Sequence, residues 1–375
     1  MDLSATLHSA AAEAGLAAVG FASAAGFPEV RRAAEERVAA GFHGGMRFTF
    51  SAPERSTDPR SSFPWAQTLL VGAWSYVPEA GSPGPAAPGT GRVARFATRD
   101  HYRPLRAALD GLAGVLGEAG HRAEVLCDDS RLVDRAAAVR AGVGWWGKST
   151  MVLAPGHGPW LLLGSVVTDA FIPLDRPMVR HCGPCVACLP ACPTGALVAP
   201  GVLDARRCLA ALAQAPGAIP REFRRAMGDR FYGCDDCLEA CPPGRRALAA
   251  AGKRGDGRVD LIEVLKAGDA ALLERFGHFY LPGREARYLR RNALVALGNS
   301  GGGGAVPIVI RYLADPDPVL RAHAAWALGE LGGTAGRDAL AAAASREADP
   351  GVLEEVYSAL TGAAAGGRQR RGSVP

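Results

Sequence analysis

The sequence predicts an α+β protein in which an α/β domain is followed by a cysteine-rich domain and a tail of helical repeats. Three observations indicate this order. Helix-like and strand-like segments alternate as far as residue 174, all but one of the nine cysteines lie between positions 182 and 241, and similar helical segments recur beyond position 258. We therefore expect domains at 1–174, 175–257 and 258–365, and a disordered basic tail at 366–375.

The first 174 residues carry the elements of the α/β domain. Short apolar runs between turn residues predict strands at 17–22, 68–76, 122–127, 151–154 and 160–168. Apolar positions at helical spacing predict helices at 4–15, 28–40, 101–117 and 132–141. The strand at 160–168 is apolar on both faces, so we place it in the centre of a sheet.

The cysteine-rich domain has the spacing of a bacterial ferredoxin. Cys182, Cys185, Cys188 and Cys192 follow the pattern C-x2-C-x2-C-x3-C-P, Cys234, Cys237 and Cys241 repeat its end, and Cys208 lies between. In this pattern the fourth cysteine of a run ligates the other cluster. We therefore assign Cys182, Cys185, Cys188 and Cys241 to a first [4Fe–4S] cluster. Cys192, Cys208, Cys234 and Cys237 are assigned to a second.

Two other uses of the cysteines fit less well. Structural zinc takes Cys-x-x-Cys pairs, which the triple run followed by Cys-Pro does not resemble. Disulfides need an oxidising compartment, and the N-terminus Met1-Asp2-Leu3-Ser4 has neither a basic signal region nor a twin arginine. No apolar run reaches the roughly 18 residues of a membrane span. We expect a cytoplasmic protein without a membrane partner, whose net charge of +5 is compatible with RNA binding.

The tail repeats itself. Segments 290–299 and 321–330 align at an offset of 31 residues (321 − 290), so that Gly298 coincides with Gly329. Asp-Pro pairs at 317–318 and 349–350 predict the starts of two similar helices. Helical pairs of this length are HEAT-like, although somewhat short.

These features together resemble the epoxyqueuosine reductase family over nearly the whole chain. The matching motifs are Cys127-Asp128-Asp129-Ser130, the RAGVGWWGK stretch at 140–148, which is similar to the family's RAGLGWxGK, and FYGCD at 231–235, which is similar to FGCD. The resemblance implies a nitroreductase-like α/β domain that binds base-off cobalamin beside one cluster. It also implies reduction of epoxyqueuosine to queuosine at the wobble position of tRNA. We then expect a monomer whose partners are a tRNA anticodon stem-loop and a low-potential electron donor.

The resemblance also implies site residues. The family's catalytic acid stands six residues before an acidic residue and an arginine, which gives Asp128, counted from Asp134-Arg135. Arg55 matches a basic position near the cofactor, and Ala97 lies where the family has YAxGxDYH. With Lys148, which follows Trp145-Trp146-Gly147, these residues are our expected cobalamin contacts. Opening an epoxide requires a proton, and a carboxyl group supplies one near neutral pH only if its pKa is raised.

Each of these residues also has a plainer interpretation. Asp128 could cap the next helix, with Asp129 as the acid instead, and Lys148 could be a solvated flanking lysine. Cys127, the ninth cysteine, is expected to be a small buried apolar residue. The basic run of Arg284, Arg287, Arg290 and Arg291 fits either phosphate contacts to RNA or a solvated helix face.

The sequence departs from the family pattern in three places. Arg99 and Arg103 replace a glycine and a histidine, Leu209-Ala210 stands for Ser-Tyr, and Pro243-Gly244 stands for Trp-Asn. These differences leave open a divergent reductase that acts on a small-molecule epoxide or halide. A pure electron carrier is a third class, but it would not need the domain before the cysteines.

Overall fold

The computed structural model describes residues 2–77, 85–251, 257–302 and 304–362, so the predicted tail at 366–375 lies outside the described residues. The chain divides into two compact units that interleave in sequence. The first unit comprises 1–82, 95–208 and 235–255, and the second comprises 83–94, 209–234 and 256–375. The mixed helix and strand content confirms the predicted α+β class. The domain boundaries expected from the sequence remain predictions.

A four-stranded antiparallel sheet forms the centre of the first unit. Its order is β1 (Ala18–Ser23), β2 (Thr68–Ser75), β7 (Leu161–Thr168) and β4 (Ala123–Cys127). The strand predicted to be central, β7, lies between β2 and β4, which confirms that expectation. The short segment predicted as a strand at 151–154 contributes only β6 (Val152–Leu153), which pairs with β5 (Trp145–Trp146).

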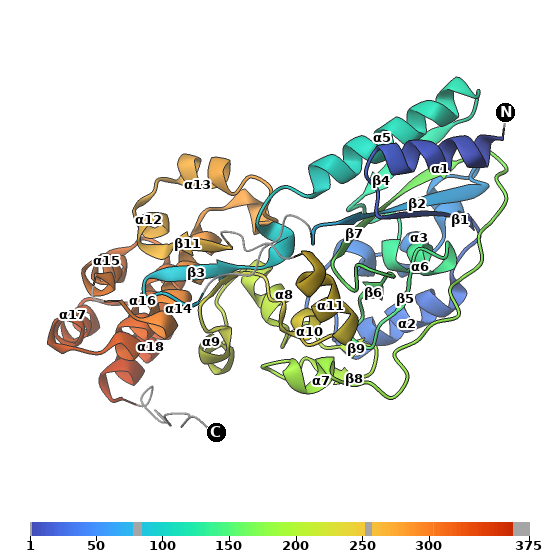
Figure 1. The fold of residues 1–375 in the computed structure, drawn as a ribbon. Helices are drawn as coiled ribbons and strands as arrows, with labels where there is room; N and C mark the ends of the chain where they lie inside the picture. The colour runs from blue at the N-terminus through green and yellow to red at the C-terminus, as the bar shows by residue number, and fades with distance from the viewer. Residues whose placement is uncertain (1, 78–84, 252–256, 303, 363–375) are drawn as a thin grey trace. The chain divides into compact units, whose positions relative to one another are not determined.

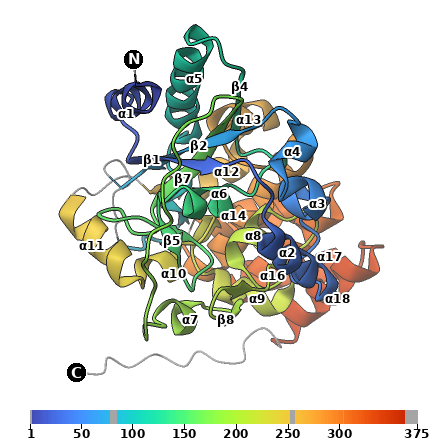
Figure 2. The same ribbon diagram turned by 90° about the vertical axis from the view of Figure 1, so that its right-hand side faces the viewer.

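Helices cover both faces of this sheet because its strands alternate their buried side chains. Leu70 and the opposite Val166 pack with α1 (Leu3–Glu13) and α5 (Tyr102–Glu118), which lie side by side in Figures 1 and 2. Leu69 and Val167 point the other way and pack with α6 (Asp134–Arg140). Helix α6 begins two residues later than predicted and ends before Gly142, whose φ of 69° is the left-handed conformation common after helices.

The remaining elements of the first unit are short. They are α2 (Pro28–Ala39), η1 (Phe48–Phe50), α3 (Pro53–Ser56), α4 (Pro59–Ser62), η2 (Arg95–Ala97), α7 (Cys188–Ala191), β8 (Leu197–Ala199), β9 (Val202–Leu203), α10 (Asp236–Glu239) and α11 (Pro242–Ala251). A Cβ atom on Gly158 would come within 2.7 Å of the Gly244 backbone, so the loop before β7 and the start of α11 pack backbone to backbone. The Trp160 indole Nε1 donates to the Gly244 carbonyl at 2.9 Å and fixes this contact.

The second unit combines a small sheet with the helical tail. In the sheet, β3 (Thr90–Val93) lies between β10 (Arg230–Tyr232) and β11 (Arg258–Asp260). The helices are α8 (Leu209–Gln214), α9 (Arg221–Met227), α12 (Leu261–Lys266), α13 (Asp269–Arg275), η3 (Pro282–Arg284), α14 (Arg287–Ser300), α15 (Ala305–Arg311), η4 (Tyr312–Ala314), α16 (Pro318–Leu331), α17 (Thr334–Ala344) and α18 (Pro350–Leu360).

The repeat predicted in the tail is present in α14, α16 and α18. Asp317 and Asp349 cap α16 and α18, each followed by proline at the first helical position, as predicted. The coinciding glycines have the same role, since a Cβ atom on Gly298 would lie 2.7 Å from the Trp326 ring and one on Gly329 would lie 3.0 Å from Ala359. Each glycine therefore admits the next helix of the stack.

The basic run beside α14 supports the helices and does not offer four free charges to RNA. Arg291 is fully buried and donates to the carbonyls of Leu212, Ala213, Ala215 and Gly217. Arg290 pairs with Asp269 at 2.6 Å, Arg287 pairs with Asp317 at 3.3 Å, and Arg284 donates to the Gly277 carbonyl at 3.0 Å. Both sequence-based interpretations, phosphate contact and solvated face, are therefore wrong for Arg291. The cause is tertiary: the segment from 212 to 217 presents carbonyls that need donors.

We predict that Arg291→Met destabilises the second unit by about 3 kcal/mol, because it leaves several buried carbonyls without a donor. The shift of the urea unfolding transition measures this loss. Arg337→Met, at an exposed position of α17, is the matched control and is expected to change the free energy of unfolding by less than about 0.5 kcal/mol. Equal stability of the two variants would contradict the assigned role of Arg291.

Candidate active site

The predicted acidic residue lies in the turn that follows β4. The last residue of β4, Cys127, pairs with Gly164 of β7. A Cβ atom on Gly164 would come within 2.6 Å of Leu109 in α5, so this glycine permits the close approach of helix and sheet. Immediately after the strand, Asp128 has a φ of 54°, a left-handed conformation that is uncommon outside glycine. Strained backbone of this kind concentrates at functional sites.

The pKa of Asp128 is raised. Burial is the main cause, the positive charge of Arg106 opposes it, and the negative charge of Asp129 adds to it. Arg106 extends from α5, and its Nη2 donates to the Cys127 carbonyl at 2.9 Å. The turn therefore holds a carboxyl group that keeps its proton to a higher pH than an ordinary aspartate.

The neighbouring carboxyl group behaves in the opposite way. Arg131 Nη2 donates to Asp129 Oδ2 at 2.7 Å, and this hydrogen bond is the main reason that the pKa of Asp129 is lowered. Asp129 is thus held as a carboxylate and makes a poor proton donor. The N-cap of α6 is Val133, without a side-chain hydrogen bond, so Asp128 does not cap that helix. The arrangement favours Asp128 over both alternatives left open by the sequence.

Two residues beside Asp128 were not recognised as candidates from the sequence. Burial, followed by the charges of Asp128 and Asp129, raises the pKa of Asp134 well above its usual range. Its Oδ1 atom is buried and has no hydrogen-bond partner within the described part of the chain. Burial and then the charges of Asp128 and Asp134 raise the pKa of Tyr102. In the sequence analysis Asp134 was used only to locate Asp128, six residues before it. No motif reveals the burial of Asp134, because that burial arises from tertiary packing.

Arg135 links this acidic group to the cysteine-rich region. Desolvation lowers its pKa, and the charges of Tyr102, Asp134, Cys208 and Cys237 act against that shift. By surface area its side chain is nevertheless exposed. One cation therefore interacts with the acidic group and with two predicted ligands of the second cluster.

The four cysteines assigned to the first cluster lie together. Burial raises the pKa of the Cys188 thiol, and the charges of Cys241, Cys182 and Cys185 raise it further. The pKa of the Cys241 thiol is raised chiefly by burial, and the negative charges of Cys182 and Cys185 raise it further. Four thiols that repel one another as anions need cations between them. The irons of an iron–sulfur cluster supply these cations.

Within the second set of cysteines, the surroundings of Cys192 are the best defined. Burial alone would raise the pKa of Cys192, but hydrogen bonds from Leu197, Thr194 and Ala196 to the sulfur lower it overall. The Ala196 amide donates to Cys192 Sγ at 3.2 Å. Hydrogen bonds of this kind stabilise a cluster thiolate and influence its reduction potential.

The nine cysteines form no disulfides. Within the described ranges, no group of three or more histidine, cysteine or acidic side chains converges on a single point at the spacing of one metal ion.

The other predicted cofactor contacts are distributed as follows. Arg55 lies close enough to Asp129 for its charge to help lower the pKa of that residue, so it is near the acidic turn. Lys148 Nζ donates to the Gly183 carbonyl at 2.7 Å and thus holds the loop between Cys182 and Cys185. Ala97 is buried at the end of η2. Contact of these three residues with cobalamin remains a prediction.

Family comparisons agree with the predicted cysteine-rich domain and with the predicted helical repeats. Residues 181–244 match a 4Fe-4S double cluster binding domain, and residues 281–361 match HEAT repeats. Among the helices that the structure describes, none has the length and apolarity to cross a bilayer. A double-cluster domain joined to an α/β domain that carries an acid of raised pKa defines an iron–sulfur oxidoreductase.

Whole-chain comparisons identify the family. Epoxyqueuosine reductases of Bacillus cereus and Bacillus subtilis are each 33% identical to this chain, over 93% and 86% of their own lengths and 92% and 85% of this chain. A crystal structure of selenomethionine-labelled epoxyqueuosine reductase superposes with a TM-score of 0.88 at 30% identity, covering 96% of this chain and 98% of the other. The chain belongs to the epoxyqueuosine reductase family.

We predict that Cys188→Ser lowers the iron content from about eight to about four atoms per chain, because a four-iron cluster needs all of its thiolates. Iron and sulfide analysis after anaerobic purification measures this loss. Cys127→Ser is the matched control, since Cys127 is buried outside both cysteine sets and should leave the iron content unchanged. Full iron loading of the Cys188 variant would contradict the ligand assignment.

Proposed function

We propose that this chain reduces epoxyqueuosine to queuosine at the wobble position of tRNA, with Asp128 as the proton donor. The observation that carries the proposal is the carboxyl group of Asp128, which is exposed on a left-handed turn beside Arg106 and has a raised pKa. Family membership supports the substrate. A relative of known structure, at a TM-score of 0.87 and 30% identity, is described with an epoxyqueuosine-modified tRNA-Tyr stem loop.

The chemistry explains why a raised pKa matters. Conversion of the epoxide to an alkene takes up two electrons and two protons and releases water. Without an acid, carbon–oxygen bond cleavage would leave an alkoxide, which is costly away from bulk water. The raised pKa lets Asp128 keep its proton to a higher pH than an ordinary aspartate, and transfer of this proton to the opening epoxide oxygen avoids that intermediate. Asp129, paired with Arg131, remains ionised throughout.

The residues around Asp128 fit a bound cobalamin. The buried Oδ1 atom of Asp134 has no hydrogen-bond partner among the described side chains, and Arg135 has accessible surface in desolvated surroundings. Both features are expected of residues that line a cofactor site. When bound, cobalamin supplies low-valent cobalt that delivers electrons to carbon. We propose that Arg55, Ala97, Asp128 and Lys148 contact it, with Lys148 also holding the cluster loop.

The remaining parts of the proposal concern partners. The cysteine sets allow electrons to arrive one at a time from a low-potential donor. The tRNA anticodon stem-loop is the proposed macromolecular substrate. We also propose that the enzyme acts as a monomer in the cytoplasm, where thiols remain reduced.

We predict that the protein, purified anaerobically and loaded with cobalamin, removes one oxygen from epoxyqueuosine in tRNA when a reductant is present. Mass spectrometry of the nucleosides measures the product. Asp128→Asn should lower the rate at least about 100-fold, because an amide cannot act as the acid. The matched control Asp129→Asn should stay within about tenfold of the parent enzyme. A protein that holds iron and cobalamin but leaves the tRNA unchanged would refute the substrate, and equal loss in both variants would refute the role of Asp128.

We predict that Arg106→Gln shifts the alkaline limb of the pH–rate profile to higher pH. The acid form of Asp128 is the active form, so activity falls as the pH rises through the pKa of this residue. The charge of Arg106 lowers that pKa, and its removal therefore extends the active range upward. Glutamine retains a donor for the Cys127 carbonyl. A profile that stays in place or moves to lower pH would contradict the electrostatic role of Arg106.

A further inference from the structure

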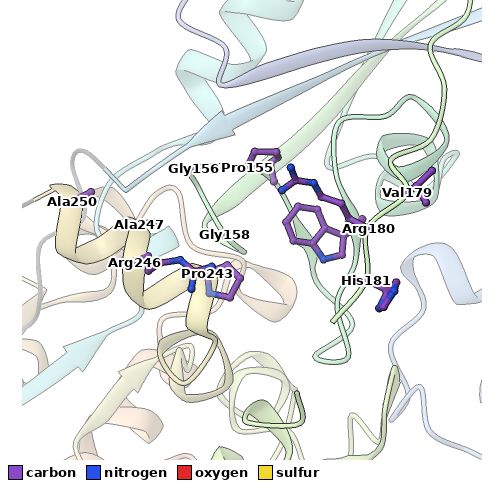
Figure 3. A pocket seen from close by; sticks show the side chains of 12 residues that line it. Pro155, Gly156, Gly158, Val179, Arg180, His181, Pro243, Arg246, Ala247 and Ala250 are labelled. Carbon is purple, nitrogen blue, oxygen red and sulfur yellow. The ribbon is translucent and has the colours of Figure 1, made fainter. Parts of the chain in front are cut away.

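A pocket of about 680 Å³ opens beside the first cysteine set. Its lining comes from the segment that leads into Cys182 and from α11, which follows Cys241. Figure 3 shows Arg180 and Arg246 extending from these two segments. Val179 in the lining is completely accessible, and Val186, which directly follows Cys185, is 46% accessible. The Gly183 amide donates to His181 Nδ1 at 2.9 Å, so the loop that carries Cys185 adjoins the pocket. We call this surface the basic face, defined by Val179, Arg180, His181 and Arg246 of the pocket and by Cys185 and Val186 of the adjoining loop.

The basic face is positive and lacks compensating charge. From residue 176 to residue 203 the sequence contains no aspartate or glutamate. Arg180 and Arg246 are both exposed, and neither forms an ion pair with another described residue. Arg180 instead lies over the Trp145 ring, 5.7 Å from its centroid. These charges are therefore available to a partner.

The basic face also contains the most accessible of the eight cluster cysteines. Cys185 is exposed, whereas Cys188 is buried and the other six are intermediate. Of the two clusters, the one held by Cys182, Cys185, Cys188 and Cys241 therefore has a ligand at the surface. Electron entry needs a short path from outside, and this face offers it without passing the acidic turn at Asp128.

We propose that the basic face docks an acidic one-electron donor protein of the ferredoxin type, which delivers electrons to the cluster held by Cys185. The arginines match an acidic partner, and the exposed valines supply the apolar centre of a small, transient interface. This inference rests on the proposed function in one respect: a reductase must receive electrons from a donor. One electron leaves the reduced donor, which becomes oxidised, and the cluster gains it, with no atom transferred.

An RNA partner suits this face less well. Proteins that bind single-stranded or looped RNA pair basic residues with exposed aromatic side chains on which bases stack. Two aromatic rings line this pocket: Trp145 is 8% exposed and lies beneath Arg180, and His181 is exposed. The exposed His181 imidazole accepts a hydrogen bond from the Gly183 amide through Nδ1, and the fully accessible hydrophobic side chain beside it is the aliphatic Val179. We therefore propose a protein as the occupant, and binding of RNA is the alternative outcome of the test.

The test measures cluster reduction in the absence of tRNA, so its outcome does not depend on the substrate assignment. A reduced acidic bacterial ferredoxin is mixed anaerobically with the iron-loaded protein, and cluster reduction is followed by stopped-flow absorbance and electron paramagnetic resonance. We expect Arg180→Glu/Arg246→Glu to lower the second-order rate at least about tenfold at low salt, and the parent rate to fall as salt increases. Arg337→Glu, an exposed arginine of α17, is the matched control and should retain the parent rate.

Reduction by a neutral photoreduced deazaflavin separates docking from damage to the cluster. The expected result is an unchanged deazaflavin rate in both charge-reversal variants. The milder pair Arg180→Gln/Arg246→Gln should lie between parent and reversed charge with ferredoxin. Unchanged ferredoxin rates in both arginine pairs would overturn the proposal. So would a selective loss of binding to a tRNA stem-loop with normal ferredoxin reduction, which would assign the face to RNA.

Discussion

The pairing of β4 with β7 fixes where the acidic turn leaves the sheet, and the proposed chemistry depends on that turn. Gly164 makes the pairing compatible with α5, because any side chain there would collide with Leu109. The same helix places Leu105 and Leu109 in the core and presents Tyr102 and Arg106, four residues apart, toward the turn. One helix therefore anchors the sheet and sets the electrostatics of Asp128.

Two adjacent aspartates have opposite protonation behaviour because their surroundings differ. Asp128 is exposed at the turn, yet partial burial raises its pKa, and the positive charge of Arg106 opposes this rise. Asp129 accepts direct hydrogen bonds from Arg131, which favour its ionised form. The negative charge held on Asp129 then raises the pKa of Asp128 and of Asp134. In the proposed mechanism, Asp129 therefore acts on Asp128 through its charge.

The sequence predicted the main elements and the cysteine sets because these follow local rules. Strand β7, the Asp-Pro helix starts and the C-x2-C pattern each depend on a few neighbouring residues. Family resemblance indicated Asp128 by counting, but the choice between Asp128 and Asp129 required the ion pair with Arg131. The buried state of Asp134 and Arg291 could not be predicted, since both depend on carbonyls and carboxylates brought near by tertiary packing. The arginine run at 284–291, which the sequence suggested to be exposed, therefore makes structural contacts.

The departure at Pro243-Gly244 has a structural explanation. A Cβ atom on Gly244 would come within 2.6 Å of the Leu238 carbonyl, and the Gly244 carbonyl accepts from Trp160 at 2.9 Å. Glycine thus lets the chain pack against the loop before β7 directly after Cys241, a predicted ligand of the first cluster. Helix α11 starts in this contact and carries Arg245 and Arg246 at exposed positions. The residues at this departure are therefore explained by packing, and they give no reason to assign a different substrate.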